Sequence, residues 1–270
     1  MLLDSLGRTI NYLRISVTDK CNYRCTYCMP EYGVMEKSHN DMLSYEEIAQ
    51  ITGIAGELGI RKIRLTGGEP LIKRNIETLV QLIADSYNFD EITMTTNGSL
   101  LTPGLAKKLA NAGLNRVNIS FDTLNPKKFN NLTRCGTLSD VVNGIQSAKE
   151  ADLNPIKINM VIFNTTTQDE IDKMQSFCNF HKLTLQKIRH FELQDHGYKT
   201  HDTECDRPLP CHLCNRLRLT ADGFLKSCLF SDDEIKVNMN TTKEDILMAV
   251  NTKQARGKSC SNRYMMEIGG

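Results

Sequence analysis

Short apolar runs alternate with amphipathic stretches through the first two-thirds of this 270-residue chain. This alternation is typical of repeated βα units around a parallel sheet. We expect strands at Tyr12–Val17, Lys62–Thr66, Glu91–Thr95, Arg116–Ser120, Ile156–Ile162 and Leu183–Arg189. A closed barrel needs about eight such strands, and alternation alone does not distinguish an open barrel from a doubly wound sheet.

Helix signals fall between these strands. Ser44 and Glu47 have the spacing of a capping box, and the helix that they open should end near Gly59. Further helices are expected at 75–86, 103–113, 138–152, 167–180 and 242–250. The polar stretch Gln194–Pro210 predicts a boundary between a first region, 1–194, and a smaller second region, 195–270.

Charge and hydropathy exclude several classes of partner. Lys plus Arg (33) nearly equals Asp plus Glu (32), so no overall field favours nucleic acid or a membrane surface. No apolar run approaches the roughly 18 residues of a membrane span, and the first residues lack a signal-peptide pattern. We therefore expect a cytoplasmic protein, in which the ten cysteines indicate metal binding or catalysis rather than disulfides.

Three cysteines follow the first expected strand with the spacing C-x3-C-x2-C: Cys21, Cys25 and Cys28. Three thiolates can hold three irons of a [4Fe–4S] cluster, whose usual complement is four cysteines. The fourth iron then stays open, and S-adenosylmethionine (SAM) can chelate it through its amino and carboxylate groups. A zinc site is the alternative, but the motif lacks the closed tetrahedral set that structural zinc requires.

A second cysteine motif, Cys211-x2-Cys214-x13-Cys228, lies late in the chain. Three ligands again allow an iron–sulfur cluster with one open iron. Cys205 precedes Cys211 by six positions, so these cysteines could instead close an all-thiolate zinc site. Cysteine spacing alone leaves both interpretations open.

Basic residues recur at alternate positions of the expected strands. If 214–220 is extended, Arg216 and Arg218 share a face with Cys214. The same alternation occurs at Arg14, at Lys62 and Arg64, and at Lys187 and Arg189. Strands covered by helices are normally almost wholly apolar, so this pattern predicts a polar barrel lumen. Such a lumen would bind a small polyanion such as a nucleoside triphosphate, because Arg captures phosphate oxygens in a bidentate manner.

The segment Tyr12–Asn22 leading into the first cysteine motif resembles the opening of the radical SAM GTP 3',8-cyclase family. The resemblance continues through Leu65–Pro70, Thr95–Gly98 and Ser120–Leu124, each at the carboxyl end of an expected strand. It implies an α/β fold, a partial (β/α)6 TIM-like barrel with a small C-terminal iron–sulfur region. It also implies SAM and two [4Fe–4S] clusters, one on each cysteine motif.

The resemblance assigns further roles residue by residue. The SAM-binding positions would be Tyr27, Gly67, Gly68, Glu69, Pro70, Thr95 and Ser120. The substrate-binding positions would be Lys62, Arg64, Arg189, Arg216 and Arg218. The catalytic positions would be Arg14 and the terminal Gly269 and Gly270.

In this family the enzyme cleaves SAM to a 5'-deoxyadenosyl radical and rearranges GTP to 3',8-cyclo-7,8-dihydro-GTP, the first step of molybdopterin synthesis. We expect a reductant such as flavodoxin or ferredoxin as a partner, whereas the sequence leaves open whether the protein is a homodimer. Family members carry several tens more residues between the strand that ends near Arg189 and the second cysteine motif. A paralogue acting on another nucleotide or on a peptide is therefore an alternative, as is a non-enzymatic zinc-binding protein.

Overall fold

All six expected strands form, and each begins and ends within one residue of its expected bounds. The computed structural model describes residues 1–34, 37–194 and 203–269. The strands are β1 (Tyr12–Ser16), β2 (Lys62–Thr66), β3 (Glu91–Thr96), β4 (Arg116–Ser120), β5 (Lys157–Ile162) and β6 (Thr184–Arg189). Each pairs in parallel with the next, as the βα alternation requires.

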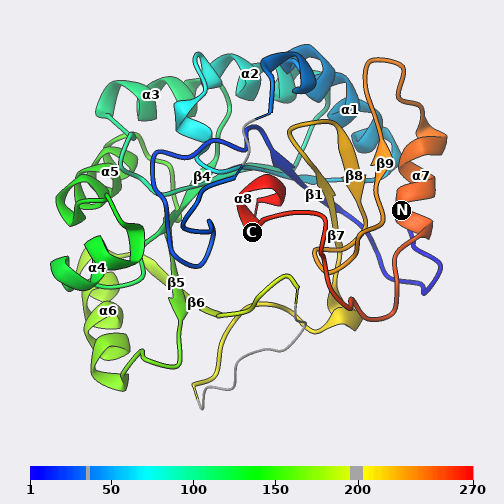
Figure 1. Cartoon of the computed structure of the whole chain (residues 1–270). Helices are drawn as coiled ribbons and strands as arrows, with labels where there is room; N and C mark the ends of the chain where they lie inside the picture. The colour runs from blue at the N-terminus through cyan, green and yellow to red at the C-terminus, as the bar shows by residue number, and fades with distance from the viewer. Residues whose placement is uncertain (35–36, 195–202, 270) are drawn as a thin grey trace.

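The order of the strands decides between the two folds that alternation left open. They lie in the sequential order β6-β5-β4-β3-β2-β1, whereas a doubly wound sheet reverses its order at a switch point. The sheet curves, and its helices follow its outer side (Figure 1). The expectation of a partial, open barrel is therefore confirmed.

The helices also form close to their expected positions. They are α1 (Tyr45–Leu58), α2 (Ile76–Ser86), α3 (Pro103–Asn111), α5 (Leu138–Glu150) and α6 (Gln168–His181). Ser44 and Glu47 make the capping box, and Gly59 ends α1 with a positive φ of 123°. α4 (Pro126–Thr133) is a further helix that was not expected, although the Asn125 side chain caps it and Pro126 occupies its first turn.

The C-terminal region extends the same sheet instead of forming a sheet of its own. β7 (Arg216–Leu219) pairs in parallel with β1, and β8 (Phe224–Lys226) and β9 (Ile235–Lys236) follow in antiparallel order. α7 (Lys243–Asn251) packs beside α1 and β8. The short α8 (Met265–Ile268) returns the chain to the middle of the barrel mouth (Figure 1). Among the described residues, no helix has the length and apolar character to cross a membrane.

A network of buried charges fastens this returning segment. Asp222, in the turn after β7, accepts hydrogen bonds from Lys37 Nζ and Arg263 Nη1, both at 2.7 Å. Arg263 also pairs with Glu234 at 2.8 Å, and Lys37 pairs with Glu267 of α8 at 2.9 Å. Burial opposes ionisation of Asp222, but its cationic partners prevail and lower its pKa from 3.8 to about 2. Its contribution to stability is therefore present above pH 3.8 and is lost as the pH falls through about 2.

We predict that Asp222→Asn lowers the free energy of unfolding at pH 7 by about 2 kcal/mol, because two charge-assisted hydrogen bonds lose their anion. Asp169→Asn is the matched control, since the side chains of Asp169 and Lys173 are 69% and 66% exposed and solvent screening leaves their ion pair little effect on stability. Urea unfolding followed by circular dichroism measures both changes. Equal effects of the two substitutions would contradict the network's role.

Candidate active site

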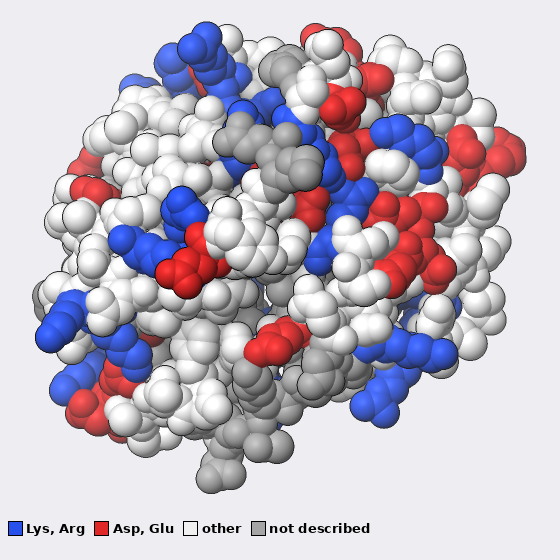
Figure 2. Space-filling view, viewed as in Figure 1, with Lys and Arg blue, Asp and Glu red and all other residues white. Residues whose placement is uncertain are grey.

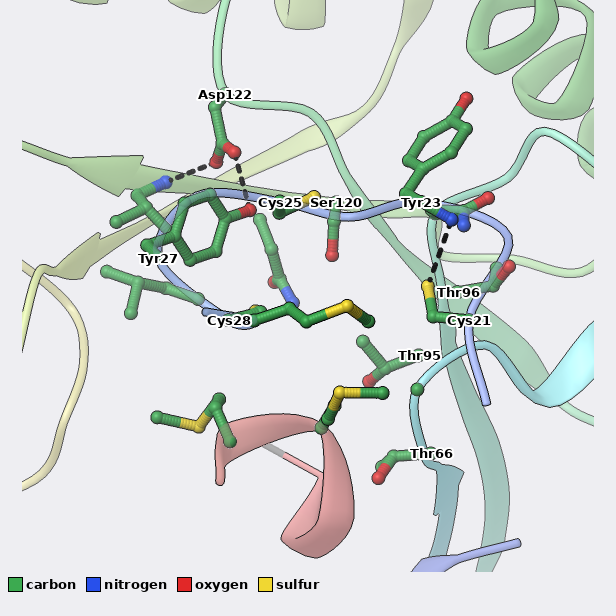
Figure 3. A pocket seen from close by; sticks show the side chains of 18 of the residues that line it. Cys21, Tyr23, Cys25, Tyr27, Cys28, Thr66, Thr95, Thr96, Ser120 and Asp122 are labelled. Atoms are coloured by element: carbon green, nitrogen blue, oxygen red, sulfur yellow. Dashed lines mark hydrogen bonds between the residues drawn. The ribbon is translucent and has the colours of Figure 1, made fainter. Parts of the chain in front are cut away.

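A first cavity of about 190 Å³ opens at the carboxyl ends of the strands. Figure 3 shows cysteines, hydroxyl side chains and Tyr27 around it. Among the residues that line it are the expected Cys21, Cys25, Cys28, Tyr27, Gly67, Gly68, Thr95 and Ser120. The structure thus brings the first cysteine motif together with the loops that follow β2, β3 and β4.

The loop after β2 holds the cysteine loop through backbone contacts. Gly68 N–H donates to the Thr18 carbonyl and Glu69 N–H donates to the Lys20 carbonyl, both at 2.8 Å. A Cβ on Gly68 would lie 2.2 Å from the Lys20 carbonyl oxygen, which is too close for any side chain. Glycine is therefore required here by the approach of the chain segment that leads directly to Cys21.

Glu69 and Pro70, both expected to bind SAM, do not line the cavity. Glu69 is fully buried, and its carboxylate accepts hydrogen bonds from the Thr96 hydroxyl at 2.6 Å and Asn97 N–H at 2.7 Å. Burial raises its pKa to about 7. Pro70 begins a short 3-10 turn, Pro70–Ile72. Both residues therefore position the loops after β2 and β3.

The three cysteine thiols lie in one low-dielectric environment. Burial raises the pKa of Cys21 to about 11 and that of Cys28 to about 12. Burial and then the neighbouring Cys28 raise the pKa of Cys25 as well. Three thiolates here would need a cation, since metal ligation is what deprotonates buried thiols.

Tyr27, between Cys25 and Cys28 in the cysteine loop, pairs with Asp122, which comes after β4 (Figure 3). The Tyr27 hydroxyl donates to Asp122 Oδ2 at 2.7 Å, and Val161 N–H donates to Asp122 Oδ1 at 2.8 Å. Burial raises the pKa of Asp122 to about 6. The sequence analysis missed Asp122, which fixes the ring of Tyr27 against Phe163 at a centroid distance of 5.4 Å.

A second cavity of about 290 Å³ lies deeper in the barrel and shares Asn159, Ile188 and Phe191 with the first. Among the described residues, one carboxylate, that of Glu91, and eight basic side chains line it: Arg14, Lys62, Arg64, Arg116, Lys157, Arg207, Arg216 and Arg218. On the face of the molecule shown in Figure 2, in contrast, basic and acidic side chains are interspersed. The lining of this cavity is therefore strongly basic, although the formal net charge of the whole chain is only +1.

Strand register explains this concentration. Arg14 of β1 stands beside Arg64 of β2 and Arg218 of β7. The alternate residues Leu13 and Ile15 are fully buried on the helix side. Alternate side chains of a strand take opposite faces, so one set packs in the core and the other lines the lumen. The predicted polar lumen is confirmed for the strands β1, β2 and β7.

For β6 the expected face was wrong. Asn159 lines the cavity and pairs with Gln186, so Gln186 and Ile188 also lie on the cavity face of the sheet. The alternate residues Lys187 and Arg189 therefore lie on the other face. Arg189 lines only the first cavity, at the end of the strand. The sequence analysis also missed Arg116, Lys157 and Arg207. The same alternation, applied to β4 and β5, would have found the first two.

The C-terminal tail enters between the cavities. Arg218 Nη1 donates to the Gly269 carbonyl at 2.8 Å. Gly269 has a φ of 63°, and a Cβ on it would meet the Thr66 hydroxyl at 1.7 Å. Met265 and Met266 of α8 line the first cavity. Gly270, also expected to be catalytic, lies outside the described residues.

The second cysteine motif surrounds the start of β7. Cys211 and Cys214 bound one 3-10 turn, and both Cys214 and Cys228 are charge neighbours of Arg218. Although burial opposes it, Lys253 and Arg216 lower the pKa of Cys214. Cys205 instead has Arg189, Lys187 and Asp206 as charged neighbours.

No group of three His, Cys, Asp or Glu residues in the described parts of the chain is placed to hold a single metal ion. This finding covers both cysteine motifs and Cys205.

Comparison with known proteins identifies the chain. A model of the Radical SAM superfamily matches residues 15–178. The GTP 3',8-cyclase of Petrotoga mobilis is 38% identical over 88% of this chain and 86% of its own length. The chain belongs to the GTP 3',8-cyclase family of radical SAM enzymes. The family implies SAM and a [4Fe–4S] cluster as cofactors.

A second family member differs from this chain in length. The GTP 3',8-cyclase of Syntrophomonas wolfei is 38% identical over all of both chains. That alignment has 334 positions against 270 residues here, a difference of 64. The family member described here is thus shorter than this relative.

Solved structures agree on the fold. Streptococcus suis SuiB bound to S-adenosylmethionine superposes with a TM-score of 0.68 at 14% identity, over 91% of this chain and 65% of SuiB. Native anSMEcpe with bound AdoMet gives a TM-score of 0.64 at 17% identity, over 88% of this chain and 80% of that protein.

The first cavity fits the cofactors that the family implies. The buried hydroxyls of Thr66 and Thr95 face it with no hydrogen-bond partner among the described residues. A bound SAM would supply polar partners, and three thiols on one loop match the donor set of a cluster. Of the expected SAM contacts, Thr95 is therefore supported by an unsatisfied atom.

We predict that Gly68→Ala lowers the iron bound per chain to roughly half or less of the wild-type value, because the added methyl displaces the Lys20 carbonyl and with it Cys21. Gly104→Ala is the matched control, since its Cβ would meet no atom within 4 Å. Iron assay after anaerobic reconstitution measures both. Equal iron in the two variants would contradict the positioning role of Gly68.

Proposed function

We propose that this chain is a GTP 3',8-cyclase that forms 3',8-cyclo-7,8-dihydro-GTP, the first step of molybdopterin synthesis. The observation that carries the proposal is the junction of a cysteine-lined cavity with a deeper cavity lined by eight basic side chains. The first suits SAM and a cluster, and the second suits a triphosphate. A peptide substrate would not require such a basic lining.

The chemistry that a bound cluster and SAM would supply is radical abstraction of a hydrogen from the ribose of GTP. The residues of the first cavity would hold SAM in place for this step. Tyr27, locked by Asp122, would pack beside the adenine, while Thr95 and Ser120 would offer hydroxyl groups. Gly67 and Gly68 keep the loop close to the cluster ligands. The protein thus contributes position and electrostatics.

The residues of the second cavity would hold the triphosphate. Arg14, Lys62, Arg64, Arg216 and Arg218 converge on it from three neighbouring strands. Their mutual repulsion in a buried space favours an anionic ligand, which would neutralise them. Arg189 would act from the rim of the first cavity. Arg14 lies on the strand that ends at the first cavity, so it stays our candidate for a catalytic role.

A second [4Fe–4S] cluster on Cys211, Cys214 and Cys228 belongs to the same proposal. It is supported by the placement of Cys214 and Cys228 beside Arg218, whose guanidinium also donates to the Gly269 carbonyl. A substrate base bound there would lie close to the tail. Flavodoxin or ferredoxin as the electron donor and a cytoplasmic location stay predictions.

We predict that the anaerobically reconstituted protein, given SAM and a reductant, forms 5'-deoxyadenosine faster with GTP than without it, together with a new isomer of GTP. Liquid chromatography with mass spectrometry follows both products. SAM cleavage that does not respond to GTP would contradict the substrate assignment and favour a paralogue acting on another molecule.

We predict about eight irons per chain in the reconstituted wild type and about four in Cys214→Ser, because one of two clusters would be lost. Cys205→Ser is the matched control and should keep about eight, since Cys205 lies beside β6 with Lys187 and Arg189. Iron and zinc are measured together by mass spectrometry. Zinc without iron at the second motif, or loss of iron in Cys205→Ser, would overturn this ligand set.

A further inference from the structure

The short segment before the second cysteine motif pairs with the free edge of β6. Asp206 N–H donates to the Lys187 carbonyl at 2.9 Å, and Arg189 N–H donates to the Arg207 carbonyl at 2.8 Å. Ile188 and Arg207 form a parallel bridge. Lys187 N–H also donates to the Asp206 carboxylate at 2.7 Å. The backbone of this segment is therefore fixed beside the last barrel strand.

This pairing carries the Arg207 side chain into the basic cavity, together with Pro208 and Leu209. Within residues 1–34, 37–194 and 203–269, the Arg207 guanidinium donates one hydrogen bond, from Nη1 to the Asp206 carbonyl at 3.3 Å. Burial, followed by repulsion from Arg216, lowers its pKa. Arg207 is thus a cation directed toward other cations, an arrangement that an anionic ligand would stabilise.

Tyr12 lies at the centre of the same group. The guanidinium carbons of Arg64 and Arg216 lie 5.6 Å and 5.8 Å from the centre of its ring. Its hydroxyl is buried and has no hydrogen-bond partner among the described residues, and Arg216 Nε is in the same situation. Two unsatisfied donors among several guanidinium groups form a built site for phosphate oxygens.

The position of this group along the barrel indicates which phosphate it would bind. Tyr12 begins β1, while the cysteine loop follows its carboxyl end at Ser16. Four residue steps along a strand span about 13 Å. A nucleotide whose ribose faces the first cavity would therefore extend its phosphate chain toward Tyr12 and Arg207.

We propose that Arg207 and the Tyr12 hydroxyl bind the terminal phosphate of the nucleoside triphosphate, at a subsite that the compressed segment of this chain completes. This inference rests on the proposed function in taking the polyanion to be a nucleoside triphosphate. The alignment with the Syntrophomonas wolfei enzyme has 64 more positions than this chain has residues. In this chain Asp206 and Arg207 pair with β6, and the Arg207 side chain lines the basic cavity.

The test is equilibrium binding of GTP, GDP and GMP to the reconstituted holoenzyme at one fixed ionic strength. Arg207→Gln should weaken GTP binding about tenfold, as expected for one charge-assisted contact, and change GMP binding less than about twofold. Tyr12→Phe should weaken GTP binding by a few fold, and Arg207→Lys should fall between Arg207→Gln and the wild type. Arg256→Gln, at an exposed position outside both cavities, is the matched control.

Equal loss of GTP and GMP binding in Arg207→Gln, or no loss relative to Arg256→Gln, would overturn the inference. A folding defect would also weaken the binding of both GTP and GMP. Each variant is therefore first compared with the wild type in its iron content and in the midpoint temperature of thermal unfolding. If Arg207→Gln differs from the wild type in iron content or thermal midpoint, GTP binding is compared in Arg207→Lys and Tyr12→Phe instead. Unchanged GTP binding in both of these variants would overturn the inference.

Inorganic tripolyphosphate separates this inference from the proposed function. If the wild type binds tripolyphosphate and Arg207→Gln weakens that binding, the subsite stands even where GTP fails to stimulate SAM cleavage. If GTP stimulates SAM cleavage but Arg207→Gln binds GTP and tripolyphosphate as the wild type does, the function stands and the subsite is wrong.

Discussion

Successive side chains on β1 and its neighbouring strands point alternately to the helices and to the lumen, and the rest of this structure depends on this alternation. Leu13 and Ile15 pack under the helices, so Tyr12 and Arg14 must face the lumen. Parallel, in-register pairing repeats this division on β2 and β7. One hydrophobic core therefore also builds a basic cavity, and the carboxyl ends of the same strands hold the loops of the cysteine cavity. Folding and ligand binding use the two faces of one sheet.

The C-terminal segment adds residues to the lumen and to the mouth of the barrel that the first six strands form. β7 supplies two guanidinium groups to the lumen and lies between the two halves of the second cysteine motif. The ion pairs of Asp222 with Lys37 and Arg263 then direct the last residues back to the barrel mouth. Gly269 reaches the carboxyl end of β2 at Thr66, beside the loop that supports Cys21. Segments from both ends of the sequence thus meet at one site.

The sequence predicted the strands and much of the lumen because apolar and polar residues alternate clearly there. It failed on β6, where no residue is fully buried on either side and the alternation gives no contrast. It could not find Arg207, which reaches the cavity from a loop through backbone pairing with β6. It also could not find Asp122 or the buried role of Glu69, because their partners come from distant segments. Short-range patterns determine which face a residue takes, whereas long-range contacts determine what it meets there.

The central claim is that the two cavities form one reaction space, with the ribose of GTP facing the first cavity and the phosphates bound in the second. Transfer of a label tests this most directly. GTP carrying deuterium at ribose C3' would be incubated anaerobically with the reconstituted enzyme, SAM and a reductant. Mass spectrometry would then measure the mass of the 5'-deoxyadenosine formed. The account predicts that deuterium appears in 5'-deoxyadenosine. Unlabelled 5'-deoxyadenosine, formed while labelled GTP is consumed, would contradict it.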